Sequence, residues 1–177
     1  MLAAMSAAPA FAASWNSIQA DSRLEFVADY EGAEAPGTFG VFTVSLDFDP
    51  GAPADASLSV DVNISSAGMD SEDIDRAIMA PEWFDSGAYP HAEFHSDSIR
   101  PLGDSEFAAD GTLSLKGTTR PLTVPFHWQA QGPFAEMTGH LTVSRTDFDI
   151  GSGEWSSGSP IGHDVQVRFK VRLEARH

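Results

Sequence analysis

The sequence contains no cysteine, and this absence narrows the kinds of site that it can hold. Disulfide frameworks, thiolate zinc sites and cysteine nucleophiles are excluded. Basic residues are scarce as well, because 10 lysines and arginines face 26 aspartates and glutamates, which gives a formal net charge of −16. Nucleic acids and anionic membrane surfaces bind to positive protein faces, so we expect neither as a partner.

Long apolar segments are also missing. No stretch approaches the roughly 18 consecutive apolar residues of a membrane-spanning helix, so no integral membrane segment is expected. The first residues, 1–12, are uncharged and end in Ala10-Phe11-Ala12. This A-x-A ending is typical of an export signal with cleavage after Ala12, although no lysine or arginine precedes it. The alternative interpretation is a disordered alanine-rich tail.

The remaining chain, residues 13–177, is dominated by alternation of apolar and polar residues. Leu58 and Val60, for example, alternate with Ser59 and Asp61. A period of two predicts β-strands with one buried face. About eight strands are expected, within the segments 24–30, 38–48, 58–64, 91–99, 107–115, 122–128, 137–143 and 165–173.

Turn residues separate these strands, and no linker or internal repeat is visible, so one domain is predicted over 13–177. Many short strands at this spacing indicate a sandwich or a barrel. Eight strands closed into a barrel leave an interior that side chains fill or that holds one small ligand. Pro121 and Pro125 fit poorly in a central strand, and they predict a bulge or a gap in the ladder beside it.

One segment breaks the β pattern. Residues 70–80 are typical of a short helix, with Asp70 as its N-cap and acidic residues in its first turn. The spacing of its apolar residues puts three on one face, namely Ile74, Ala77 and Ile78. The apolar pair Trp83-Phe84 that follows is expected to pack at one end of the barrel.

Patterns that indicate catalysis are weak. The glycine-rich segment 151–155 lacks the lysine and the following helix of a phosphate loop. His91, Glu93 and His95 alternate along one strand and project from one face, where they could hold a divalent ion. Because Phe94 occupies the inward register of that strand, a solvated outer face is the better interpretation. We therefore expect no metal site and no catalytic residue.

Aromatic residues remain as the candidates for a binding site. The chain has 12 phenylalanines, four tryptophans and two tyrosines, and many fall on inward-facing positions. Rigid rings suit a ligand cavity, yet an ordinary packed core explains them more simply from the pattern alone. The clearest candidates are Phe26, Phe42, Phe94, Phe126 and Trp128, with Phe148 and Trp155 near the turn after the seventh strand.

Several motifs occur in a fixed order along the chain and carry a resemblance. They include GTF at 37–39, DFDP at 47–50, WFD at 83–85, YPHAEF at 89–94, GTLSLKGTTRP at 111–121, RTDFDIG at 145–151 and IGHDV at 161–165. No single motif is decisive, but the ordered set resembles the YceI-like family of bacterial periplasmic lipid-binding proteins with a lipocalin-like fold.

The resemblance implies an all-β fold, an eight-stranded antiparallel lipocalin-like barrel with one short helix after the third strand, packed at the barrel opening. It implies an elongated apolar cavity for a polyisoprenoid, a quinone-like prenylated ring or a related amphiphile. It also implies a periplasmic location, and binding and transport in place of catalysis, with no cofactor beyond a bound isoprenoid-type lipid. An open mouth is a surface that a homodimer could cover.

The expected lipid contacts combine this resemblance with strand parity. Phe39 and Phe94 match family motifs, and the others follow from their inward register. The full set is Phe26, Phe39, Phe42, Phe84, Phe94, Phe126, Trp128, Phe148 and Trp155.

The expected contact to the ligand head group departs from the family pattern. Relatives commonly carry a histidine in the first strand, whereas this chain has Ala28-Asp29-Tyr30 and then an acidic loop at 31–36. A polar contact to the head group is therefore lost or replaced.

Two other functions also fit the sequence. A stress-response or structural barrel with a filled core would bind other proteins. An enzyme acting on a lipid would need a polar side chain inside the barrel, such as His95 or His127. The interior of the barrel discriminates between all three functions.

Overall fold

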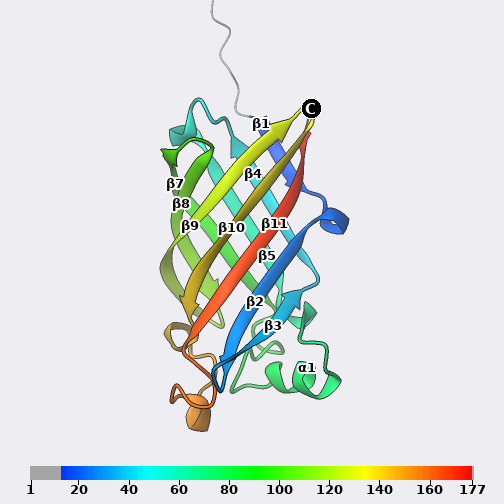
Figure 1. The fold of residues 1–177 in the computed structure, drawn as a ribbon, viewed down its shortest axis with the longest axis vertical. Helices are drawn as coiled ribbons and strands as arrows, with labels where there is room; N and C mark the ends of the chain where they lie inside the picture. Colours follow the sequence, from blue (N-terminus) through cyan, green and yellow to red (C-terminus); the bar gives the residue numbers. More distant parts are fainter. Residues whose placement is uncertain (1–12, 177) are drawn as a thin grey trace, which may run out of the picture.

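The computed structural model describes residues 13–176, which form an antiparallel β-barrel with one short α-helix (Figure 1). The predicted export signal at 1–12 lies outside the described residues. The strands are β1 (Ala13–Ser17), β2 (Arg23–Tyr30), β3 (Ala33–Phe39), β4 (Phe42–Phe48), β5 (Ser57–Asn63), β6 (Ala67–Gly68), β7 (His91–Gly103), β8 (Glu106–Leu115), β9 (Thr118–Gln131), β10 (Phe134–Ser144) and β11 (Asp164–Arg176). The helical segments are α1 (Glu72–Ile78) and the 3-10 helices η1 (Gln19–Asp21), η2 (Pro53–Asp55), η3 (Ile64–Ser66), η4 (Arg145–Phe148) and η5 (Gly153–Trp155).

These strand segments make eight strands around a closed barrel. Three strands are interrupted: β1 and β2 flank η1, β3 and β4 flank a short break, and β5 and β6 flank η3. β11 pairs with β10 on one side and with both β1 and β2 on the other, which closes the sheet. All neighbouring strands run antiparallel, and α1 follows the third strand. The predicted eight-stranded antiparallel barrel is therefore confirmed.

The segment predicted as an acidic loop, 31–36, is mostly a strand. Glu31 and Gly32 alone make the turn between β2 and β3, with φ angles of 52° and 84°. Two consecutive residues with positive φ suit a two-residue hairpin, because their twist matches that of the flanking strands. The second strand thus begins at Ala33, before the predicted start.

The start of α1 also differs from the prediction. Ser71 is the N-cap, and its Oγ accepts a hydrogen bond from the Ile74 N–H at 3.5 Å. Asp70 lies one residue earlier, with a positive φ of 58°. Serine and aspartate have similar capping preferences, so the sequence does not decide between adjacent candidates.

The ladder between β9 and β10 stops part-way, as the two prolines predict. Within the described chain, pairing between these strands ends at Thr138 and His127, and Figure 1 shows the strands diverging beyond that point. The Trp128 N–H donates to a carbonyl on the β8 side at 2.8 Å, so odd-numbered residues of β9 direct their N–H groups toward β10. Pro121 and Pro125 have odd numbers and lack that donor, which explains the gap.

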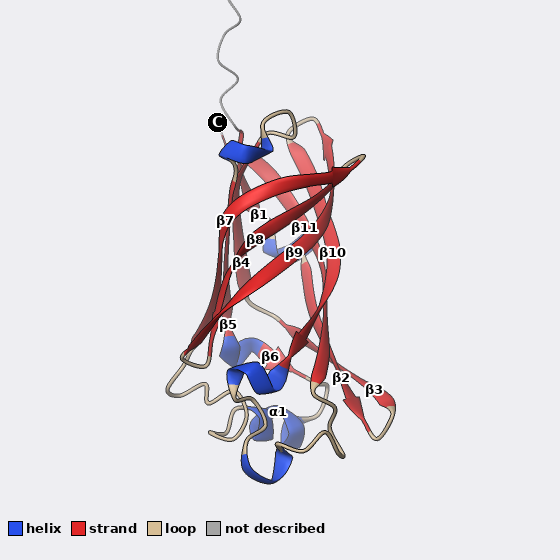
Figure 2. Ribbon diagram, turned by 90° about the vertical axis from the view of Figure 1, so that its left-hand side faces the viewer, coloured by secondary structure: helices blue, strands red, loops and turns tan. Residues whose placement is uncertain are grey.

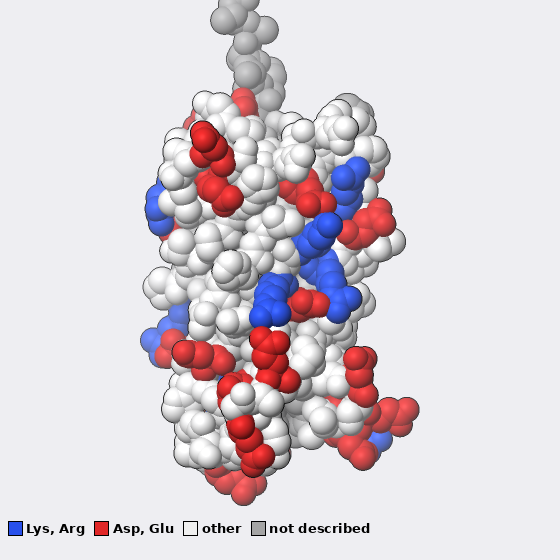
Figure 3. Space-filling model, viewed as in Figure 1, with Lys and Arg blue, Asp and Glu red and all other residues white. Residues whose placement is uncertain are grey.

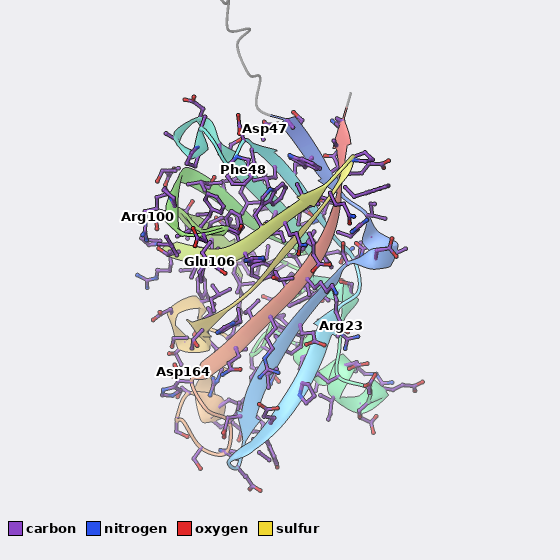
Figure 4. All side chains as sticks on the ribbon, turned by 45° about the horizontal axis from the view of Figure 1, so that its top comes forward. Arg23, Asp47, Phe48, Arg100, Glu106 and Asp164 are labelled. Atoms are coloured by element: carbon purple, nitrogen blue, oxygen red, sulfur yellow. The ribbon has the colours of Figure 1, made fainter. Side chains whose placement is uncertain are left out.

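One end of the barrel is filled by five buried rings, which we name the aromatic plug: Trp15, Phe48, Phe107, Phe126 and Trp128. The Phe48 ring packs edge-on against Phe107 and Trp128, with centroid distances of 4.9 Å and 5.0 Å. Trp15 contacts Trp128 at 5.2 Å. Phe48 lies near the start of β1 (Figure 4), so the plug closes the end at which the described chain begins.

Candidate ligand-binding cavity

The remainder of the barrel is hollow. A cavity with a volume of about 720 Å³ extends from the plug toward the opposite end. This volume lies within the roughly 300–1,000 Å³ of small-molecule sites in proteins. A filled interior, which the structural-barrel hypothesis requires, therefore describes only the plug end.

Alternation along the strands produces the apolar wall. In a β-strand every second side chain points to the same face, so the predicted period of two places one apolar series inward. The outward series carries the polar residues of the same strands. Wall residues from the middle of the strands include Val44, Val60, Leu113, Val124, Leu141, Val167 and Phe169.

Seven of the nine predicted contact residues lie along this cavity. Phe26, Phe39 and Phe84 form one cluster, with ring centroids 5.0 to 6.2 Å apart. The other four are Phe42, Phe94, Phe148 and Trp155. Their contact with a lipid stays a prediction.

Phe126 and Trp128 lie elsewhere, because both belong to the aromatic plug. Strand parity correctly predicts that they point inward. Parity gives no information on the level along the barrel axis, however, and at their level Trp15, Phe48 and Phe107 occupy the interior. These two residues are thus part of the packed core, outside the cavity lining.

The cavity opens at the end opposite the plug, which we call the mouth. Figure 2 shows α1 and the β2–β3 hairpin together at this end. The third part of the rim is segment 149–162, which we call the mouth loop and which contains η5. Mouth residues that line the cavity include Tyr30, Ala33, Ile74, Ala77, Trp155 and Ile161.

Arg145 is the only buried charged residue among those described, with 3% of its surface exposed. It stands at the end of β10, and its guanidinium lies 5.6 Å from the Trp83 ring centroid. Its N–H groups donate to backbone carbonyls on the mouth loop and beside it: Nε to Gly162 at 2.8 Å, Nη1 to Ile150 and Gly151 at 2.9 and 3.1 Å, and Nη2 to Trp155, Ile161 and Ser157 at 2.7, 2.8 and 3.4 Å.

These hydrogen bonds hold the backbone of the mouth loop around the Arg145 guanidinium. A guanidinium has five N–H donors, and six carbonyls surround this one. Burial lowers the pKa of Arg145 from its ordinary value, yet arginine stays protonated in proteins. Gly151 is required beside it, because its φ is 76° and a Cβ there would overlap the guanidinium.

The sequence gives little warning of this role. Arginine is almost never fully buried unless it is paired, so Arg145 carries no signal of burial by composition. Its position at the head of the 145–151 motif, with Gly151 at the end of that motif, is the one available hint.

Carboxylates are the remaining charged groups that line the cavity, and they belong to Asp29, Glu34 and Asp73. Glu34 lies 3.3 Å from Arg168, and Asp73 lies 3.6 Å from Arg76. These side chains are exposed, so each pair contributes only about 0–1 kcal/mol. Figure 3 shows many acidic side chains over the mouth end of the face in view and some near the plug, whereas most of the basic ones lie across the middle.

The histidines considered for chemistry lie on the outer surface. His91 contacts Asp61 at 3.0 Å, and His127 contacts Glu106 at 3.0 Å. His95 is exposed on the same outer face as His91. Within residues 13–176, no group of three or more histidines and carboxylates is placed to hold a metal ion.

A match to the YceI-like domain covers residues 15–173. The chain belongs to the YceI-like family. The match includes every strand of the closed barrel, so the family applies to the whole described fold.

Relatives of this YceI-like chain include a UPF0312 protein from Shewanella oneidensis, which is 29% identical and is matched over 73% of this chain and 78% of its own length. The crystal structure of Burkholderia cenocepacia BcnA is 28% identical, covers 88% of this chain and 98% of its own, and gives a TM-score of 0.86. A polyisoprenoid-binding domain from Saccharophagus degradans has the same fold, with a TM-score of 0.72, 16% identity and coverage of 94% and 99%. Among the described residues, the helices are too short or too polar to cross a membrane.

Proposed function

We propose that this YceI-like protein binds a polyisoprenoid or a related long-chain amphiphile in its cavity and carries it through the periplasm unchanged. The observation that carries this proposal is the apolar cavity of about 720 Å³, closed by the aromatic plug at one end. Such a shape matches a long apolar chain with a polar group at one end. The polyisoprenoid-binding domain of the same fold supports this ligand class.

Burial of the apolar chain supplies the affinity. Each 100 Å² of apolar surface removed from water contributes about 2.5 kcal/mol. The lining provides that burial without specific polar contacts, since its middle consists of aliphatic and aromatic side chains. Specificity then depends on the few polar groups at the mouth.

The positions of the reactive groups support binding without catalysis. His91, His95 and His127 are on the outside. Inside the described barrel, Arg145 is the one buried charge, and its N–H groups are engaged by carbonyls. The proposed location in the periplasm rests on the export signal predicted for residues 1–12. A homodimer that covers the mouth is compatible with the exposed side chains of Tyr30 and Ile74.

The test is native mass spectrometry of protein exported by bacteria, followed by organic extraction. We expect a bound amphiphile that is released on extraction, and the same spectrum reports the subunit number. Val60→Trp, which places a large ring into the cavity, should lower the occupancy. The matched control is Thr43→Trp, on the outer face of the adjacent strand, and it should keep the ligand.

Two results would contradict the proposal. One is repeated preparations that hold no ligand and show no affinity for added prenyl lipids. The other is equal occupancy in the Val60→Trp and Thr43→Trp variants, because the ligand would then lie outside the cavity.

A further inference from the structure

The closed end of the cavity fixes the direction in which a ligand lies. The plug residues occupy the interior at one end, so a long-chain ligand would enter through the mouth with its apolar tail first. The polar head of an amphiphile then stays at the mouth. The charged groups that line the cavity lie at this same end, in the β2–β3 hairpin, in α1 and beside the mouth loop.

Arg145 is the one cation that lines the cavity within the described chain. Arginine binds a phosphate by directing two parallel N–H groups at its oxygens. Here those N–H groups donate to carbonyls, with the shortest contacts at 2.7 and 2.8 Å to Trp155 and Ile161. A phosphate would have to displace these bonds and open the mouth loop, so Arg145 is not a free anion site.

The other charged groups that line the cavity are carboxylates. Asp29 and Glu34 come from the β2–β3 hairpin and Asp73 comes from α1, and all three line the cavity. Their nearby cations, Arg168 and Arg76, are exposed and already lie beside Glu34 and Asp73. The field at the mouth is therefore negative, as the acidic mouth end in Figure 3 indicates.

We infer that the mouth selects its ligand by the charge of the head group, accepting uncharged or cationic heads and disfavouring phosphate. The inference rests on the proposed function and adds the chemical class of the head. Alcohol, phenol, quinone and amine heads fit the mouth, because none brings a negative charge next to the three carboxylates. Polyprenyl phosphates place that charge at the rim, where Arg145, the one cation that lines the described cavity, is engaged by carbonyls and Lys116 donates to the Asp149 carbonyl.

The test compares three ligands with the same tail: farnesol, farnesylamine and farnesyl phosphate. Affinity is measured by displacement of a fluorescent apolar probe from the full chain, at low salt and at about 0.3 M salt. The carboxylates are exposed, so their effect is screened within about 10 Å at 0.1 M ionic strength and reaches much further at 0.01 M. We expect the amine to bind at least about tenfold more tightly than the phosphate at low salt, and the ratio to shrink in high salt.

Charge variants show whether the mouth is responsible. Asp29→Asn, Glu34→Gln and Asp73→Asn together should raise phosphate affinity, lower amine affinity and leave farnesol unchanged. The matched control removes three negative charges near the plug, through Asp55→Asn, Asp104→Asn and Glu174→Gln, which are exposed residues. The control should keep the wild-type ratio, because those carboxylates lie at the far end of the barrel.

The outcomes separate this inference from the function on which it rests. Equal or tighter binding of the phosphate in the wild-type protein would overturn it, and so would the same amine-to-phosphate ratio in the mouth variant and the wild type. Failure of all three ligands to displace the probe would contradict the proposed function itself, and the inference with it.

Discussion

Arg145 is the hydrogen-bond donor for six backbone carbonyls, so its replacement leaves several of them without a donor. We expect Arg145→Lys to lower the free energy of unfolding by about 2–4 kcal/mol, because lysine has three N–H donors on one atom and leaves buried carbonyls unsatisfied. Urea denaturation followed by circular dichroism measures the change. The matched control is Arg100→Lys, which alters an exposed pair with Asp110. Equal destabilisation by both substitutions would show that the carbonyl contacts do not stabilise the mouth loop.

At the residue scale, the sequence predicts whether a side chain points into the barrel better than it predicts the level of that side chain along the barrel axis. Strand parity predicts that Phe42 and Phe94 point inward, and both line the cavity. Phe126 has the same parity but lies in the plug, because the level of a residue along the barrel depends on strand tilt and register, which no local pattern contains. Arg145 escaped prediction for another reason, since its burial depends on carbonyls of the mouth loop, a segment without regular alternation.

At the scale of elements, the gap between β9 and β10 has a measurable consequence. The N–H groups of Glu136 and Thr138 face β9 where the ladder is intact, and those of His140 and Thr142 face the gap. We therefore expect the amide hydrogens of His140 and Thr142 to exchange faster than those of Glu136 and Thr138. Hydrogen exchange followed by NMR resolves the four amides. Uniform protection along β10 would mean that the strands pair throughout.

Elements with clear alternation or clear breakers were predictable, and interrupted strands were not. Pro121 and Pro125 predicted the gap because proline removes a donor at a known position. The Glu31-Gly32 turn was missed because glutamate seldom adopts positive φ, so the acidic residues suggested a loop. The first strand segment, β1, was also missed, because its five residues contain few apolar positions.

For the whole molecule, the division into a plug and a cavity predicts uneven stability. Phe126→Ala should cost about 3–5 kcal/mol, because its ring is fully packed and its loss leaves a void in the plug. Phe169→Ala should cost at least about 1 kcal/mol less, since that ring already faces empty space. Chemical denaturation of the ligand-free proteins measures both. Equal losses would indicate that the cavity collapses around Phe169.

The whole-molecule shape was predictable only in part. Alternation predicts about eight strands and the family resemblance implies their closure into an antiparallel barrel, but the choice between a hollow and a filled barrel depends on summed side-chain volumes at each level. The aromatic content is compatible with both. The structure resolves this by packing five rings together at one end, while the other inward rings and the aliphatic side chains surround a void.

Ser14 and Arg176 pair at the plug end, so both ends of the described chain leave the barrel on the side away from the opening (Figure 1). A label, a fused domain or a surface attachment added at either end would therefore stand clear of the cavity opening. A protein immobilised by either end would therefore keep the cavity opening free, a geometry that suits a sensor for apolar molecules.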